Sequence, residues 1–214
     1  MEKLITEEML APLRDAMSKI MSKERYAHTL AVEEMVIRLC DLYCPEKKTL
    51  LRAAALLHDF TKEYDSKVQL SILTKPGIEF SSEDSLAPKT FHARTASLLI
   101  PDLYNEYAND ELISAVRWHT TGKAKMTLSE KILYLADYID MSRDYADCVK
   151  LRKFFFDAEP ENMEEHDRFL HLDRTLLRSF NMTLADLLER GMIISKDTVN
   201  ARNDVICAIH NAEG

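Results

Sequence analysis

Along most of this chain the apolar residues recur three and four positions apart. This spacing places them on one side of a helix, whereas a half-buried strand would alternate with a period of two. In the stretch 22–44, for example, the apolar side consists of Ala31, Val32, Met35, Leu39 and Leu42. We find no convincing strand pattern and no internal repeat. The pattern therefore predicts a chain built of successive helices.

Capping and breaking residues predict where these helices begin and end. Ser22 is a good cap for the second helix, Pro45 ends it, and Thr127 with Glu130 has the capping-box pattern. Pro160 lies near a predicted start and Gly191 follows a predicted end. The expected helices cover about residues 6–21, 22–44, 46–60, 65–73, 91–100, 110–119 and 128–141, two or three segments of 147–190, and 197–212.

Composition supports the same fold class. The chain has 214 residues but only 4 glycines and 6 prolines, which argues against a loop-rich or all-β fold. It is long enough to bury a core without disulfides or metal staples. We expect an all-α fold in a single domain, 1–214. The longest loop-like stretch is 76–90, "PGIEFSSEDSLAPKT", and the sequence leaves open whether it is a mobile lid or a connection.

Charge and cysteine content narrow the function classes. The 28 basic and 36 acidic residues give a net charge of −8, which disfavours binding to nucleic acid or to an anionic membrane. The first residues do not resemble a signal peptide, and no apolar run approaches the roughly 18 residues of a membrane span. The four cysteines show no C-x-x-C pair. These features predict a cytoplasmic protein with reduced thiols.

The stretch "AAALLHDF", residues 53–60, brings an imidazole and a carboxylate to the end of an apolar run. A charge on the inward side of a helix is costly unless it is paired or bound to a metal. Similar polar residues occur at other predicted helix ends or inward faces. They are His28, His92, His119 and Asp137.

Each of these residues alone has an ordinary structural interpretation. A single histidine at a helix end is most often a cap or a satisfied core residue, and Asp137 alone would be a buried hydrogen-bond acceptor. Together, four imidazoles and two carboxylates from successive helices predict one or two divalent metal ions. His166, His171 and His210 lie in charged or terminal segments, and we expect structural or solvent roles for them.

Four segments in this order carry a resemblance: "RYAHTLAVEEM", "LLHDFTKE", "FHARTA" and "RWHTTGKAKMTLSEKILYLADYID". They resemble the HD superfamily of metal-dependent phosphohydrolases, and most closely its YqeK group of symmetrical diadenosine-tetraphosphate hydrolases. The likeness covers about residues 20–145 and extends to "KDTVNARND" near the C-terminus. It implies an HD-domain helical bundle with additional C-terminal helices over about 146–214.

The resemblance also implies a division of the ligands. One metal would be held by His28, His58, Asp59 and Asp137, and a second by His92 and His119, with Asp59 bridging. The metal in this group is usually taken to be iron, and manganese or cobalt can serve. The group often has Glu-Pro after "ADYI", where this chain has Asp140 and Met141, so the loop before Arg143 departs from its pattern.

The implied substrate is a polyphosphate, which needs cationic and hydroxyl partners. Candidate residues near the ligands are Arg25, Lys62, Arg94, Thr120, Thr121, Gly122, Lys123 and Lys131. We favour Lys62 and Lys131 as catalytic cations beside Asp59, which would orient the metal pair, although each basic residue could equally be a solvated surface charge. We expect one nucleotide end of the substrate to be bound by the loop 76–90 or by the "NARND" segment, with Arg202 and Asn203.

The leading hypothesis is a metal-dependent hydrolase that cleaves diadenosine tetraphosphate symmetrically into two ADP. We expect this small molecule as its partner and expect no binding to nucleic acid or to a membrane. The sequence leaves open whether the protein forms a homodimer. The alternatives are another HD-type nucleotide phosphatase or phosphodiesterase, and a non-catalytic nucleotide-binding regulator; a scaffold role is weaker. The chain lacks a "G-Y-P" segment after the His-Asp pair, which disfavours a cyclic-dinucleotide enzyme.

Overall fold

The computed structural model describes residues 3–75 and 77–213, and these residues contain helices and no strand. The α-helices are α1 (Leu10–Ile20), α2 (Lys23–Tyr43), α3 (Lys48–Leu57), α4 (Ser66–Leu73), α5 (Phe91–Leu103), α6 (Asp110–Trp118), α7 (Leu128–Ile139), α8 (Ala146–Phe156), α9 (Glu165–Glu189) and α10 (Lys196–Glu213). Short 3₁₀ turns cover Glu7–Met9, Pro45–Lys47, Asp84–Leu86, Pro88–Thr90, Asn105–Tyr107 and Pro160–Asn162. The predicted all-α class is confirmed.

Most helix ends lie where the capping residues predict them. The Ser22 hydroxyl accepts a hydrogen bond from the Arg25 N–H, and Thr127 and Glu130 satisfy each other's backbone N–H groups before α7. The predicted end of α5 at residue 100 is wrong, because the helix continues through Pro101 to Leu103. Proline removes one N–H donor but does not prevent the following turn from closing, and the Tyr104 N–H bonds to the Ile100 carbonyl.

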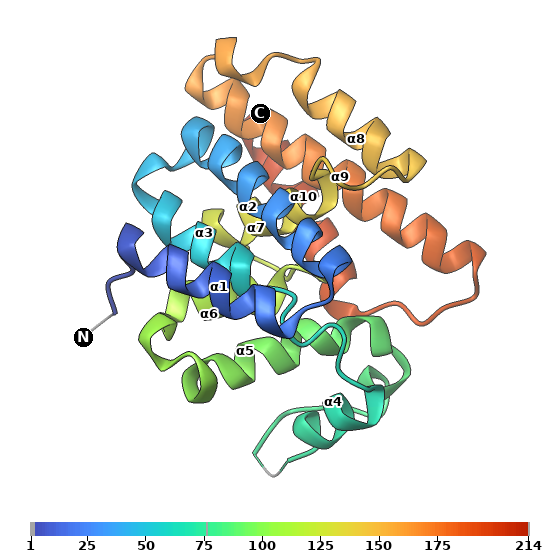
Figure 1. Cartoon of the computed structure of the whole chain (residues 1–214). Coiled ribbons are helices and arrows are strands. Elements are labelled where there is room, and N and C mark those ends of the chain that lie inside the picture. Colours follow the sequence, from blue (N-terminus) through green and yellow to red (C-terminus); the bar gives the residue numbers. More distant parts are fainter. Residues whose placement is uncertain (1–2, 76, 214) are drawn as a thin grey trace.

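Helix α3 lies at the centre of the first part of the chain. It packs chiefly against α2, α6 and α1, while α7 packs against α2 and α6 (Figure 1). Its residues Ala53–Leu57 are completely buried, so the sequence run that reads as core does form core. Because α3 is enclosed on several sides, its C-terminal end has little freedom to move.

The C-terminal helices α8 and α9 pack against α7, and α10 packs against α9 (Figure 1). The Phe180 ring of α9 lies 4.8 Å from the Tyr134 ring of α7, centroid to centroid, and is completely buried. His171 is also buried, with its Nε2 3.0 Å from the Phe155 carbonyl, so it faces inward although its segment reads as a charged surface helix. None of the helices in the described ranges is both long and apolar enough to cross a membrane.

The connection between α6 and α7 passes closely beneath the C-terminal helices at Gly122. This residue has φ of 63°, in the left-handed region. A Cβ atom placed here would lie 2.8 Å from the Phe180 ring and 3.0 Å from Ala201. Glycine is therefore required both for the backbone conformation and for the close approach of α9 and α10.

We expect Gly122→Ala to lower the free energy of unfolding by roughly 2–4 kcal/mol, since left-handed strain and overpacking add. Gly191 is the matched control: its φ is 60°, but no atom lies within 4 Å of the position that a Cβ atom would occupy there. Gly191→Ala should cost only about 1–2 kcal/mol, the strain alone. Urea denaturation of both variants measures the difference, and equal losses would contradict the packing argument.

Candidate metal centre

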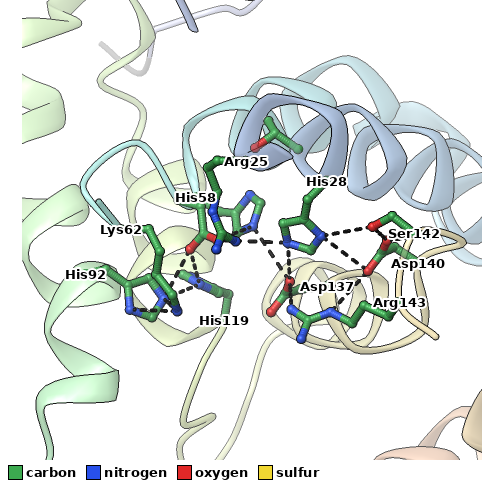
Figure 2. A network of polar contacts seen from close by, with 12 residues as sticks. Arg25, His28, His58, Lys62, His92, His119, Asp137, Asp140, Ser142 and Arg143 are labelled. Atoms are coloured by element: carbon green, nitrogen blue, oxygen red, sulfur yellow. Dashed lines mark hydrogen bonds and ion pairs between the residues drawn. The ribbon is translucent and has the colours of Figure 1, made fainter. Parts of the chain in front are cut away.

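Five helix ends bring the predicted ligands to one place (Figure 2). His28 comes from the second turn of α2, and His58 and Asp59 directly follow α3. The other three are His92 in the first turn of α5, His119 after α6 and Asp137 in the last turn of α7. His58, His92, His119 and Asp59 are at most 3% exposed. The sequence prediction that these six side chains converge is therefore supported by their geometry.

The ligand atoms form two groups that share Asp59. In the first, His28 Nε2 lies 3.0 Å and His58 Nε2 lies 3.7 Å from Asp137 Oδ1, and Asp59 Oδ2 lies 3.5 Å from His58 Nε2. In the second, His92 Nε2 and His119 Nε2 are 3.1 Å apart. They lie 3.2 and 3.6 Å from Asp59 Oδ1. One carboxylate thus presents one oxygen to each group.

Hydrogen bonds on the far side of the rings fix which nitrogen faces the centre. His58 Nδ1 lies 2.6 Å from the Ala55 carbonyl, and His119 Nδ1 lies 2.7 Å from the Val116 carbonyl. A carbonyl only accepts, so each Nδ1 carries the proton and each Nε2 presents a lone pair to the centre. Backbone carbonyls commonly orient metal-binding histidines in this way.

Several buried atoms at the centre have no hydrogen-bond partner within the described ranges. They are His28 Nε2, His58 Nε2 and Asp59 Oδ1, together with the donor Arg25 Nε. Leaving buried polar atoms unsatisfied is costly, and the imidazole and carboxylate atoms are of types that bind metals once they carry no proton. The ligand-to-ligand distances also match bonds of about 2.0–2.2 Å to a common ion. The donor set of imidazoles and carboxylates therefore fits two divalent transition metals.

The protonation states of the metal-free protein suit this interpretation. Burial lowers the pKa of His58 to about 4 and that of His92 well below its ordinary value, so both rings are neutral at pH 7. Burial alone would raise the pKa of Asp59, but the surrounding imidazoles and Lys62 hold it well below its usual range. His28 differs: burial is outweighed by Asp137 and Asp140, which raise its pKa to about 9, so this ring must lose a proton before it can bind a metal.

Three cations surround the carboxylates (Figure 2). Arg25 Nη1 lies 2.7 Å from Asp59 Oδ2, and Arg143 Nη2 lies 2.5 Å from Asp137 Oδ1. The Lys62 ammonium lies 3.1 Å from His92 Nε2. Burial together with the two arginines lowers the pKa of Lys62. These three cations compensate the carboxylates of Asp59, Asp137 and Asp140, so the charges at the centre nearly balance in a chain whose net charge is −8.

Two residues of this centre were not among the predicted site residues. Asp140 is completely buried, with Oδ2 3.5 Å from His28 Nδ1, and it accepts hydrogen bonds from Ser142 and Arg143. Arg143 joins Asp140 to Asp137. The signal was present in the sequence: Asp140 follows Asp137 by one helical turn. It is also the first residue of the doublet that departs from the family pattern.

Of the other predicted site residues, some lie at the centre and others lie away from it. Thr120 is at the centre, its hydroxyl 3.1 Å from His92 Nε2, while the Thr121 hydroxyl donates to the neighbouring Gly122 carbonyl. The remaining candidates contact other partners: Arg94 with Asp84, Lys123 with Glu130, Lys131 with Asp173, and Arg202 with Asn181 and Asn203. The structure does not bring these last residues into contact with the ligands.

Two cavities adjoin the centre. The polar cavity, of about 470 Å³, is lined by residues that include Arg25, His28, Lys62, Ser142, Arg143 and Tyr145. The apolar cavity, of about 480 Å³, is lined by residues that include Thr120, Tyr138, Arg143, Tyr145, Met182, Leu187, Met192 and Ile193. A third, the distal cavity, of about 630 Å³, lies between the segment 77–90, Arg94, Trp118 and the start of α10.

Comparison with known proteins agrees with this geometry. The family model described as "HD domain" matches residues 25–142, which includes all six ligands. Because the match covers more than half of the chain, the protein belongs to the HD domain family. A solved structure described as a predicted HD superfamily hydrolase involved in NAD metabolism, from Clostridium acetobutylicum, is similar with a TM-score of 0.80 and 29% identity. That similarity covers 92% of this chain and 97% of the other.

Curated relatives are similar over nearly their whole length. Proteins named symmetrical bis(5'-nucleosyl)-tetraphosphatase from Halalkalibacterium halodurans and Bacillus subtilis are 27% and 26% identical to this chain. The alignments cover 87% and 90% of this chain and 91% and 92% of the relatives. A protein of the same name from Staphylococcus aureus is 24% identical, over 85% of this chain and 86% of its own length.

We expect Asp59→Ala to remove bound metal from the protein, since this carboxylate belongs to both ligand groups. After anaerobic purification, elemental analysis should show metal content lower than in the parent by about tenfold or more, comparable with the loss when supporting residues are removed from other metal sites. His166→Ala is the control, because His166 is exposed and lies outside the centre. Full metal content in Asp59→Ala, or a loss in His166→Ala, would contradict the ligand assignment.

Proposed function

We propose that the protein is a metal-dependent hydrolase that cleaves diadenosine tetraphosphate symmetrically into two molecules of ADP. The observation that carries this proposal is the pair of ligand groups joined by Asp59 and faced by three cations. The curated relatives supply the substrate, because all three are named as symmetrical bis(5'-nucleosyl)-tetraphosphatases. The substrate partner is thus a small dinucleoside polyphosphate.

His28, His58 and Asp137 would hold one metal ion, and His92 and His119 the second, with Asp59 between them. Bound divalent ions, iron first with manganese or cobalt as substitutes, would polarise a phosphoryl oxygen and lower the pKa of the attacking water. The backbone carbonyls behind His58 and His119 keep these rings in the tautomer that the metals require.

The protein's own residues would bind and align the polyphosphate. Arg25, Lys62 and Arg143 line the polar cavity next to the ligands, where they face an anionic chain of phosphates. The Thr120 hydroxyl also lies against His92. In hydrolysis, the water oxygen bonds to one of the two central phosphorus atoms, and the bond from that phosphorus to the oxygen between the two central phosphates breaks. One ADP leaves with that oxygen, the attacked half becomes the second ADP, and a proton of the water is released to solvent. These cations would stabilise the charge that develops on the leaving ADP.

The structure favours Lys62 over Lys131 as the catalytic cation. Lys62 lies against His92 and lines the polar cavity. Lys131 is instead 2.5 Å from Asp173 of α9, and we assign it to the packing of α7 against α9. The complete set of six ligands disfavours a non-catalytic regulator, since a pure nucleotide-binding protein does not need both groups.

All four cysteines of the protein are free thiols. This supports a location in a reducing compartment, which we propose to be the cytoplasm.

Incubation of the metal-loaded protein with diadenosine tetraphosphate should give ADP as the only nucleotide product. Symmetrical cleavage breaks the central bridge, so both halves are identical. Chromatographic product analysis with added iron or manganese tests this, and a panel of mononucleotides tests the alternative phosphatase activity. AMP and ATP in equal amounts would mean asymmetric cleavage and would contradict the proposal.

We expect Lys62→Met to lower kcat/KM by about tenfold or more, since removal of one preorganised charge at the reacting phosphate is costly. Metal content should be retained, because Lys62 is not a ligand. Lys131→Met is the matched control and should stay within a few-fold of the parent. If Lys131→Met lost more kcat/KM than Lys62→Met, the catalytic cation would be Lys131.

A further inference from the structure

The apolar cavity has no role in holding metal, yet it opens directly beside the centre. Thr120 lines it, and the hydroxyl of Thr120 lies 3.1 Å from His92 Nε2. Arg143 lines it too, 2.5 Å from Asp137. The cavity therefore touches the surroundings of both ligand groups.

The apolar and polar cavities also share a wall. Arg143 and Tyr145 line both of them. The polar cavity has the three cations available for phosphates, with Glu24, Glu63 and Asp144 also in its lining. The lining of the apolar cavity includes Met182, Leu187 and Met192. A ligand with a polyanionic part joined to a flat, largely apolar part would match this pair of neighbouring cavities.

We propose that the apolar cavity binds one nucleoside of the substrate, while the attached phosphates lie at the metal centre. This inference rests on the proposed function, since it assigns a place to one half of a dinucleoside tetraphosphate. A volume of about 480 Å³ falls in the range of small-molecule sites, about 300–1,000 Å³. Thioether and branched aliphatic side chains suit the two faces of a base.

Tyr145 is the residue to which we assign the stacking contact. It lies in the loop before α8, between the two cavities, and 70% of its surface is exposed. A large aromatic side chain left exposed at the mouth of a cavity can stack on a base at little cost in conformational entropy. Arg152 of α8 fixes this loop, because it donates hydrogen bonds to the carbonyls of Ile139 and Arg143.

The other candidate locations fit a nucleoside less well. Arg202 and Asn203, which the sequence suggests, line none of the three cavities found in the described part of the chain. The distal cavity is larger but includes none of the metal ligands or of the three cations at the centre. Its Arg94 is held by Asp84. We therefore assign the nucleoside-binding site to the end of α9 and the segment that follows it, not to the middle of α10.

The test uses the manganese-loaded protein with two probes, ADP and inorganic tripolyphosphate. Leu187→Trp places a bulky ring in the apolar cavity, and Leu188→Trp, on the next residue of α9, is the control because Leu188 is 68% exposed and does not line the cavity. We expect Leu187→Trp to weaken ADP binding by about tenfold or more, the scale of losing one stacked base. Inhibition by tripolyphosphate should be unchanged, since it needs only the centre.

A second pair of variants tests the aromatic contact at Tyr145, where the two cavities meet. Tyr145→Ala should weaken ADP binding about five- to tenfold, within the range measured for base–aromatic stacking. Tyr145→Trp should retain ADP binding, and neither variant should change metal content or the effect of tripolyphosphate. If Leu187→Trp does not fold, the Tyr145 pair decides the matter.

Parent-like ADP binding in Leu187→Trp, or in both Tyr145 variants, would overturn the assignment of the apolar cavity. Equal weakening of ADP and tripolyphosphate would also overturn it, because the effect would then act through the centre. The proposed function is judged separately, by the products that the parent protein forms from diadenosine tetraphosphate. If the parent makes ADP alone but the variants bind ADP normally, the proposed function stands and the assignment of the nucleoside to the apolar cavity is rejected.

Discussion

The burial of one carboxylate organises this protein. Asp59 is 3% exposed, and its two oxygens face different groups of histidines. A buried charge is tolerated only where opposite charges or metal ions compensate it. The completely buried run Ala53–Leu57 holds α3, and with it Asp59, in a fixed position. The remaining ligands then need only approach this point from the ends of the neighbouring helices.

Charges at the centre nearly balance, whereas the whole chain carries a net charge of −8. Arg25, Lys62 and Arg143 lie beside the acidic residues Asp59, Asp137 and Asp140, so they compensate the buried carboxylates. At physiological ionic strength charges on exposed groups are screened beyond about 8 Å, so the charges at the centre act on a bound anion more strongly than the distant acidic surface does.

The C-terminal helices do more than cover the core. Arg152 of α8 bonds to the backbone of the loop that carries Asp140, Arg143 and Tyr145. Phe180 of α9 packs against Gly122, three residues after His119. The segment 146–214 thus supports two loops at the metal centre and provides most of the apolar cavity. This couples the packing of the extension to the geometry of the substrate site.

The sequence by itself determined the helices and most of their ends, and it predicted the six residues that we propose as metal ligands. Helical spacing and capping residues act within a few positions, so they can be read locally, and the histidines stood out because they interrupt apolar faces. The sequence also predicted Arg94, Lys131, Arg202 and Asn203 at the site. In the structure Arg94 contacts Asp84, Lys131 contacts Asp173, and Arg202 contacts Asn181 and Asn203. Only the tertiary structure decided which basic residues reach the ligands, that Asp140 and Arg143 adjoin His28 and Asp137, and where the cavities lie. Those features depend on how helices distant in sequence pack together, which no local pattern encodes.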